Sequence, residues 1–217
     1  MNKGIFIIGT NTDIGKTYVT ARLIKQLGSK YKIAYYKACM SGIEIDHEKI
    51  ISSDLKYVCD YAKLKKEDAK VSYLYQEPYS PHLAARINKN FIDLDVVKND
   101  INALSLNHDL IIAEGSGGIV CPLKAENDNL IMLSDVIKLT NFPIIIVTSS
   151  KLGSINDAIL TANYAKQLNF KILGFIMNNF DKNNIIHLDN YKMIEKLSGL
   201  KILGYLEKDS DEIKRFI

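Results

Sequence analysis

GTNTDIGKT, residues 9–17, has the composition of a phosphate-binding loop, but its first half is irregular. The usual pattern of such a loop is G-x-x-x-x-G-K-[ST]. Counting back from Gly15, the first glycine should occupy position 10, which is Thr10, and Gly9 stands one place early. An apolar, strand-like run, IFIIG at 5–9, precedes the loop, and an amphipathic helical pattern follows it. This order predicts a backbone cradle for phosphate, closed by the N-terminus of a helix.

Short apolar runs alternate with helical patterns along most of the chain. The runs at 109–114 and 142–150 are continuous and rich in β-branched residues, which is typical of strands buried on both faces of a parallel sheet. Further strands are predicted at 5–9, 32–37, 171–179 and 201–206, and helices at 17–30, at 155–168 and over a stretch that ends at 193–199. The segment 38–108 is expected to hold two or three helices and a long loop around 76–85. The alternation predicts an α/β fold with a mostly parallel sheet flanked by helices on both faces, the P-loop nucleoside triphosphate hydrolase architecture, in a single domain spanning 1–217.

Composition narrows the class of protein. The chain has 217 residues, of which 47% are hydrophobic, enough for one substantial core. The net charge is +3 and the basic residues are scattered among acidic ones, so nucleic acid is not an expected partner. No apolar run approaches ~18 residues and no signal pattern opens the chain, so we expect no membrane association. Three widely spaced cysteines read as reduced thiols, and a cytoplasmic location is expected.

The phosphate loop implies a magnesium nucleotide, and the strand ends offer ligands for it. Lys16 brings a positive charge to the β- and γ-phosphates, and Thr17 offers a hydroxyl to Mg²⁺. Glu114 stands at the carboxyl end of a predicted strand, directly before the flexible run GSGG at 115–118, so it is a predicted metal ligand. From composition alone, Asp54 is more simply a cap or first-turn acid of a helix.

Further positive charges follow two other predicted strands. Lys37 ends the second strand, and Lys151 follows the strand at 142–150. With Lys16 they are expected to bring three ammonium groups to one crevice, which suits chemistry with several negative charges. The helix start LGSIND at 152–157 is predicted either to bind a carboxylate on its N–H groups or only to cap its own helix.

Seven motifs, in order and through most of the chain, resemble those of the dethiobiotin synthetase family. They are GTNTDIGKT (9–17), YYKACMSG (35–42), SD (53–54), EPYSPHLAA (77–85), AEGSGGIVCPL (113–123), SKLGSINDAILTA (150–162) and LGFIMNN (173–179). The resemblance implies an ATP- and Mg²⁺-dependent cyclo-ligase of biotin biosynthesis. Its substrates would be 7,8-diaminononanoate and CO₂, and its products dethiobiotin, ADP and phosphate. The implied route runs through a carbamate and a carbamic-phosphoric anhydride.

The resemblance also implies a role for each matching residue. Lys16 and Lys37 would be catalytic, holding the carbamate and γ-phosphate oxygens, and Thr17, Asp54 and Glu114 would bind the metal. The implied nucleotide-binding residues are Asp13, Ile14, Gly15, Lys16, Thr17, Tyr18, Asp54, Glu114, Gly115, Ser116, Gly117, Asn178 and Asn179. The implied substrate-binding residues are Thr12, Ser41, Lys151, Gly153, Ser154, Ile155 and Asn156, the last four at a helix start of a partner subunit in a homodimer. The irregular half of the phosphate loop would then face the second substrate.

Two departures from the family pattern concern the nucleotide base. Asn178-Asn179 stands where the family often has Asn-Asp, and the chain after the last strand lacks the usual proline. An Asp that would accept from the adenine amino group is either lost or replaced by an amide that can turn either way, and the proline-containing loop usual beside the purine is missing, so we expect relaxed purine specificity.

Two alternative functions fit the phosphate loop. Other amide-forming P-loop synthetases commonly carry a glutaminase domain, for which 217 residues leave no room. Partitioning-type switch ATPases have a second lysine early in the loop, and the stretch 10–13 has none.

Overall fold

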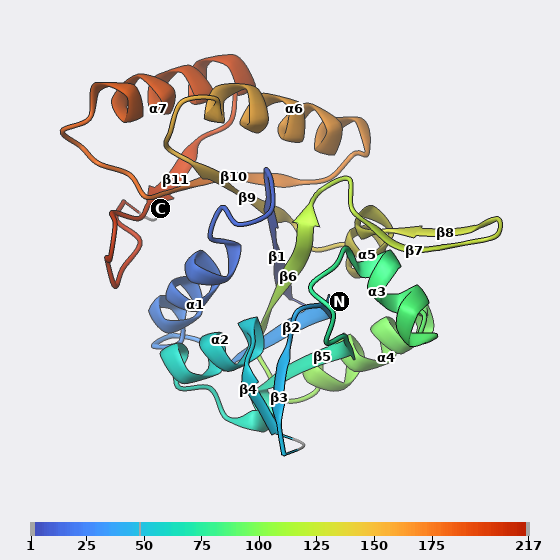
Figure 1. The fold of residues 1–217 in the computed structure, drawn as a ribbon. Helices are drawn as coiled ribbons and strands as arrows, with labels where there is room; N and C mark the ends of the chain where they lie inside the picture. The colour runs from blue at the N-terminus through green and yellow to red at the C-terminus, as the bar shows by residue number, and fades with distance from the viewer. Residues whose placement is uncertain (1–2, 48, 216–217) are drawn as a thin grey trace.

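The computed structural model describes residues 3–47 and 49–215, and in this part of the chain seven strands form one sheet (Figure 1). The strand order is β11-β10-β9-β1-β6-β2-β5, and every neighbouring pair is parallel. In that order the strands are β11 (Ile202–Tyr205), β10 (Ile172–Asn178), β9 (Ile144–Ser149), β1 (Gly4–Gly9), β6 (Leu110–Gly118), β2 (Ile33–Met40) and β5 (Ala69–Leu74). The predicted α/β fold with a mostly parallel sheet is confirmed.

Helices cover both faces of this sheet (Figure 1). On one face Leu23 and Val58, from the first two helices, pack with Ile112 of β6. On the other face Ala162 packs in the same cluster as Ile111, the neighbour of Ile112 in β6. Successive residues of one strand therefore enter opposite halves of the core, which explains the continuous apolar runs. The helices are α1 (Lys16–Leu27), α2 (Asp54–Ala62), α3 (Pro81–Asn88), α4 (Leu94–Ser105), α5 (Leu133–Thr140), α6 (Ser154–Gln167) and α7 (Ile185–Ser198).

The predicted strands are all present, with ends shifted by a few residues, but the segment 38–108 differs from expectation. It contains the three helices α2, α3 and α4, and in addition the edge strand β5, which the sequence pattern does not predict. β5 pairs only with β2, and of its residues only Val71 and Tyr73 are buried, so its apolar alternation is short. The expected loop around 76–85 is also shorter, because α3 begins at Pro81, a favourable first helical residue.

Two hairpins and a 3₁₀ turn lie outside the seven-stranded sheet. Two antiparallel hairpins project from the main sheet, β3 (Glu44–Asp46) with β4 (Lys49–Ser52), and β7 (Pro122–Glu126) with β8 (Asn129–Met132). A 3₁₀ turn, Lys66–Asp68, leads into β5. Neither the hairpins nor α5 follow from the sequence pattern, because each is too short to show a clear period.

A buried arginine ties the end of the chain to the first two helices. Arg22 is 5% exposed, and its Cζ lies 3.2 Å from the ring centroid of Tyr18 and 4.0 Å from that of Tyr61. Its Nε donates to the carbonyl of Ser210 at 3.0 Å, and a terminal N–H donates to the hydroxyl of Tyr57 at 2.6 Å. The segment after β11 is thereby fixed against α1 and α2.

Replacing Arg22 with methionine is expected to lower the free energy of unfolding by about 2–3 kcal/mol. Methionine keeps much of the packing volume but removes the cation and both donors. Urea unfolding followed by circular dichroism measures the change. Arg86→Met is the matched control, because Arg86 is half exposed and pairs with Glu126 at the surface, so a loss below about 1 kcal/mol is expected there. Equal losses in the two variants would contradict the anchoring role of Arg22.

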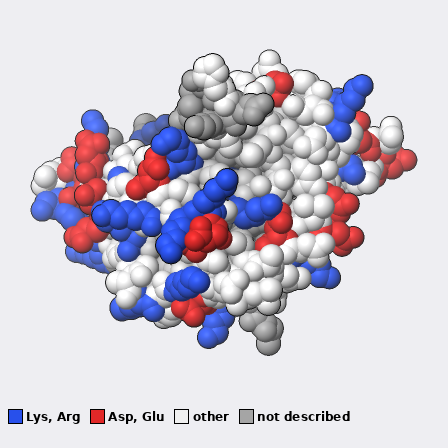
Figure 2. All heavy atoms as spheres, turned by 90° about the horizontal axis from the view of Figure 1, so that it is seen from below, with Lys and Arg blue, Asp and Glu red and all other residues white. Residues whose placement is uncertain are grey.

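The face of the molecule seen from below carries both signs of charge (Figure 2). Figure 2 shows the face seen from below, where lysine and arginine side chains are interleaved with aspartate and glutamate. Within the described residues, no helix combines the length and the apolar character needed to cross a membrane.

Candidate active site

The phosphate loop lies between β1 and α1, at the carboxyl edge of the sheet. Thr10 donates its N–H to the carbonyl of Val147 in β9 at 3.0 Å, which fixes the first half of the loop. Asp13 and Gly15 adopt left-handed backbone conformations, with φ of 55° and 87°. No side chain of the described residues caps α1 at Gly15, so the first N–H groups of that helix are available to an anion.

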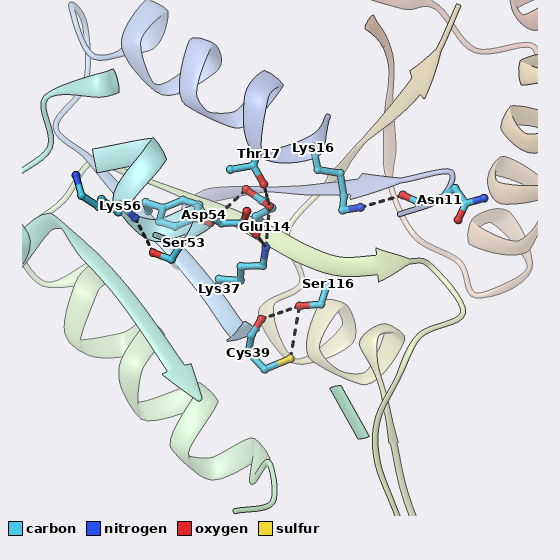
Figure 3. A network of polar contacts seen from close by, with 11 residues as sticks. Asn11, Lys16, Thr17, Lys37, Cys39, Ser53, Asp54, Lys56, Glu114 and Ser116 are labelled. Carbon is cyan, nitrogen blue, oxygen red and sulfur yellow. Dashed lines mark hydrogen bonds and ion pairs between the residues drawn. The ribbon is translucent and has the colours of Figure 1, made fainter. Parts of the chain in front are cut away.

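Lys16 leans over the first half of the loop. It is 8% exposed, and its Nζ donates to the carbonyl of Asn11 at 2.9 Å (Figure 3). Burial lowers the pKa of Lys16, and the nearby carboxylate of Glu114 partly opposes this effect. The ammonium group is thus held inside the site by a single backbone acceptor, which a phosphate oxygen can replace.

A second ammonium group lies at the centre of an oxygen cluster (Figure 3). The Nζ of Lys37 lies 2.5 Å from Oδ2 of Asp54 and 2.9 Å from Oε1 of Glu114. The hydroxyl of Thr17 donates to the same Glu114 oxygen at 2.7 Å, and that of Tyr35 donates to the other oxygen at 3.2 Å. Lys37 and Glu114 are register partners on β2 and β6, so strand pairing itself brings them together.

In this cluster, neighbouring opposite charges shift pKa values in the direction that favours the charged forms. Burial alone would lower the pKa of Lys37, but Glu114 and Asp54 outweigh it and hold that pKa well above its ordinary value. Burial would raise the pKa of Asp54, but the adjacent Lys37 ammonium holds it below its ordinary value. At neutral pH Lys37 and Asp54 are therefore both charged.

Asp54 is the first residue of α2, but it does not cap that helix. Ser53 is the N-cap, and its side chain accepts the N–H of Lys56 at 3.0 Å. The Asp54 carboxylate turns instead toward Lys37. Because Ser53 caps the helix, the carboxylate of Asp54 is free to pair with Lys37.

Three oxygen donors around one cation form a set that a metal ion can use. Thr17 contributes a hydroxyl, and Asp54 and Glu114 contribute carboxylates. Mg²⁺ prefers oxygen ligands and commonly takes one or two protein carboxylates together with phosphate oxygens. The donors fit such an ion, and Glu114, at 1% exposed, would bind it away from bulk water.

These groups line one cavity of about 280 Å³. Its lining contains eleven of the residues that the sequence and the family resemblance single out, namely Thr12, Asp13, Gly15, Lys16, Thr17, Lys37, Ser41, Asp54, Glu114, Ser116 and Gly117. The twelfth lining residue is Met40, which sequence reasoning misses because it reads as an ordinary buried strand residue. Thr12 from the irregular half of the loop and Ser41 after β2 both reach this cavity.

The expected grouping of Lys151 with Lys16 and Lys37 in one crevice is not seen within the described chain. Lys151 is exposed and does not line the cavity. It follows β9, which lies on the opposite side of β1 from β6 and β2. Buried Asn190 of α7 also donates to the carbonyls of Ser150 and Lys151, at 2.9 and 3.0 Å, and so ties this connection to α7.

Other singled-out residues also lie outside the cavity lining, which are Ile14, Tyr18, Gly115, Gly153, Ser154, Ile155, Asn156, Asn178 and Asn179. Buried Asn178 donates through Nδ2 to the carbonyl of Ile14 at 2.9 Å, so it supports the phosphate loop from behind. Asn179 is exposed, with φ of 55°. The hydroxyl of Tyr18 donates to the carbonyl of Ser210, away from the cavity.

A larger cavity, about 1000 Å³, lies elsewhere, at the outer edge of β5 between α2 and α4. Its floor is apolar, with Leu55, Val71 and Leu104 among its lining residues. It contains none of the phosphate-loop residues, so volume does not identify the site here. The small polar cavity carries the chemistry.

Comparison with known proteins agrees with this geometry. A family model described as an AAA domain matches residues 3–213. The ATP-dependent dethiobiotin synthetase BioD of Clostridium botulinum strain Alaska E43 is 47% identical over 224 residues, covering 100% of this chain and 98% of the relative. The protein of the same name from Brachyspira hyodysenteriae is 46% identical over 206 residues, covering 94% and 91%.

Solved structures resemble the chain in fold alone. A plasmid partition protein from Borrelia burgdorferi superposes with a TM-score of 0.63 at 15% identity, covering 99% of this chain and 94% of that one. The septum site-determining protein MinD from Pyrococcus horikoshii, complexed with Mg-ADP, gives a TM-score of 0.59 at 18% identity, covering 96% and 82%. These likenesses confirm the P-loop architecture, whereas the function is carried by the closer sequence relatives.

Proposed function

Because the chain belongs to the ATP-dependent dethiobiotin synthetase family, we propose that it converts 7,8-diaminononanoate, CO₂ and ATP into dethiobiotin, ADP and phosphate through a carbamate and a carbamic-phosphoric anhydride. The enzyme is a ligase of biotin biosynthesis that depends on ATP. One observation carries the mechanistic proposal. Two buried ammonium groups, Lys16 and Lys37, share one small cavity with Thr12, Ser41 and a metal-type oxygen set.

The reaction needs charge stabilisation and positioning more than a protein nucleophile. One substrate amine forms a bond to the carbon of CO₂ and loses a proton, which gives the carbamate. A carbamate oxygen then bonds to the γ-phosphorus as the bond from that phosphorus to the ADP oxygen breaks. The second amine bonds to the carbamate carbon and loses a proton, the bond from that carbon to the phosphate oxygen breaks, and phosphate leaves as the ring closes. Thr12 and Ser41 would orient the amine end, since the other two hydroxyls of the cavity, those of Thr17 and Ser116, donate to Glu114 and to the carbonyl of Cys39.

In the second step the carbamate and the γ-phosphate, both negatively charged, must approach each other. Two positively charged lysines in the cavity would stabilise this approach. Lys16 would hold γ-phosphate oxygens in place of the Asn11 carbonyl that it now contacts. Lys37 would reach both the carbamate and the γ-phosphate and reduce their mutual repulsion. Thr17, Asp54 and Glu114 would hold Mg²⁺, which supplies further positive charge at the phosphates.

The nucleotide would lie on the phosphate loop, with Asp13 to Tyr18 donating backbone N–H groups and Gly115 to Gly117 close to the phosphates. Asn178 contacts the loop through Ile14, and the base would lie near Asn178 and Asn179. The Nδ2 of Asn178 donates to the carbonyl of Ile14, while its buried Oδ1 has no hydrogen-bond partner among the described residues. Asn179 is an exposed amide that can present either a donor or an acceptor.

We therefore predict weak discrimination between ATP and GTP. The ratio of kcat/KM for the two nucleotides should stay below ~100, which corresponds to about 2.7 kcal/mol. Steady-state ADP or GDP release at saturating diamine and bicarbonate measures it. Asn179→Asp leaves only acceptor oxygens, which suit the adenine amino group, and should shift the ratio toward ATP by about tenfold. A larger preference for ATP in the unaltered enzyme would contradict this prediction.

We further propose a homodimer, with the substrate carboxylate held by the N-terminus of the partner's α6. Large apolar side chains near the β9–α6 connection support this, since Leu152 is 82% exposed and Leu160 is 62% exposed. Val120, which follows β6, is 60% exposed. The segment from Lys151 to Asn156, which is exposed except for buried Ser154 and partly buried Ile155, would then complete the site of the other subunit. A single domain and a cytoplasmic location accompany this proposal.

The decisive experiment measures ADP release with the diamine and bicarbonate each omitted in turn. Release should need both, because the carbamate is the group that attacks ATP. Formation of dethiobiotin, followed by mass spectrometry, should match ADP one to one. Hydrolysis that ignores the diamine would overturn the proposal and favour a switch ATPase.

A further inference from the structure

Lys37 lies where its ammonium group contacts the two proposed carboxylate ligands of the metal. Its Nζ is 2.5 Å from Asp54 and 2.9 Å from Glu114, and the Thr17 hydroxyl shares the same Glu114 oxygen. We propose that Lys37 is a built-in cation that occupies the divalent metal site of the nucleotide-free enzyme, and that it yields this position only when metal and nucleotide arrive together. The inference rests on the proposed metal ligands, so its test must separate the two.

The charges explain why the metal should bind poorly while Lys37 remains. The pair Asp54 and Glu114 carries two negative charges, and Lys37 already compensates one of them at contact distance. Lys16 adds a further positive charge to the same cavity. A divalent cation on the same oxygens would lie close to both ammonium groups, which are themselves buried (8% and 4% exposed), so the like charges repel.

Lys37 cannot simply swing into water to make room. Its side chain is only 6% exposed, and the residue lies on β2 between two neighbouring strands. A buried ammonium group that leaves one anion needs another nearby, since an unpaired buried charge is costly. The cavity can supply such an anion only when a ligand brings it, in the form of phosphate or carbamate oxygens.

Nucleotide and metal should therefore bind in a coupled way. The nucleotide phosphates offer Lys37 a new partner and offer the metal additional oxygen ligands. Without the nucleotide neither exchange is favourable, so free metal should bind weakly. Removing the Lys37 charge should strengthen the binding of free metal, although it weakens the chemistry.

The test uses Mn²⁺ as the probe, counted by electron paramagnetic resonance, with the nucleotide-free full-length enzyme. Lys37→Met should bind Mn²⁺ at least ~10-fold more tightly than the unaltered enzyme, a gain of about 1.4 kcal/mol. Lys37→Arg keeps a positive charge at this position, so its affinity for Mn²⁺ should stay as weak as that of the unaltered enzyme. Lys56→Met is the matched control, because Lys56 lies on α2 with Asp54 but is 48% exposed and pairs with Asp60, and its Mn²⁺ affinity should not change.

A second measurement uses only the unaltered enzyme, so it does not depend on whether a variant folds. Mn²⁺ alone should leave the melting temperature of the unaltered enzyme nearly unchanged, whereas Mn²⁺ with ADP should raise it above the value with ADP alone. Tight binding of Mn²⁺ to the nucleotide-free enzyme, or equal affinities of Lys37→Met and the unaltered enzyme, would overturn the inference.

The ligand set is tested separately with Asp54→Asn in the presence of ADP. If this change weakens Mn²⁺ binding but Lys37→Met does not strengthen it without nucleotide, the ligand assignment stands and the inference fails. If Asp54→Asn leaves Mn²⁺ binding with ADP unchanged, the proposed ligand set itself is wrong.

Discussion

Lys37→Gln is expected to lower kcat for dethiobiotin formation by at least ~10³-fold, about 4 kcal/mol of transition-state stabilisation. Glutamine nearly keeps the reach and the donor but removes the charge that carbamate and γ-phosphate oxygens would share. KM for ATP should change less than about tenfold, since Lys16 and the backbone cradle remain. Steady-state ADP release with both substrates measures the effect.

The control for this loss is Lys56→Gln, which removes an equal charge from the surface of α2. Its turnover should stay within about twofold, because exposed ion pairs contribute little. Lys37→Gln leaves buried Glu114 without its nearest cation, so its melting temperature should be recorded beside activity. Near-normal turnover in a folded Lys37→Gln enzyme would remove Lys37 from the mechanism.

Gly15→Ala is expected to weaken ADP binding by more than ~100-fold, about 2.7 kcal/mol, and to destabilise the fold. Gly15 has φ of 87°, a conformation that side chains rarely adopt. An added Cβ would also lie 2.1 Å from Nδ2 of Asn178. Asn178 must then move and release the carbonyl of Ile14, which would disorder the phosphate loop from behind. Isothermal titration with ADP measures the affinity.

Gly199→Ala separates backbone strain from the clash. Gly199 also has a left-handed conformation, with φ of 69°, but nothing in the described residues approaches an added Cβ within 4 Å, its own chain neighbours aside. This change at the end of α7 should cost about 1 kcal/mol of stability and leave ADP affinity unchanged. If Gly15→Ala affects ADP binding no more than Gly199→Ala, the close approach of Asn178 does not support the loop as described.

Sequence reasoning succeeds where a residue's position along an element determines its place in space. Glu114 and Lys37 end predicted parallel strands, and such ends meet at one edge of the sheet, so their proximity follows from the pattern. Asp54 is harder, because a polar residue at a helix start usually caps the helix. Only the structure shows that Ser53 takes the cap and leaves Asp54 to face Lys37.

The expected position of Lys151 and the unpredicted strand β5 have one physical cause in common. No local sequence pattern determines the order of the strands in the sheet. Lys151 also follows a strand, but β9 lies beyond β1, so its end leads away from β2 and β6. The edge strand β5 has one neighbour and few buried side chains, so it leaves little periodicity to detect. The location of Lys151 and the pairing of β5 both depend on contacts between segments that are far apart in the sequence.

The pairing of β2 with β6 has a consequence for how the enzyme matures. Lys37 and Glu114 are 77 residues apart in the chain, and they meet only after these two strands have joined the sheet. A chain still leaving the ribosome thus has the phosphate loop long before it has the acid–ammonium cluster beside it. Because nucleotide and metal would engage both parts, they would recognise and stabilise only the completed sheet, so the cellular ATP pool would favour finished molecules over partly folded ones.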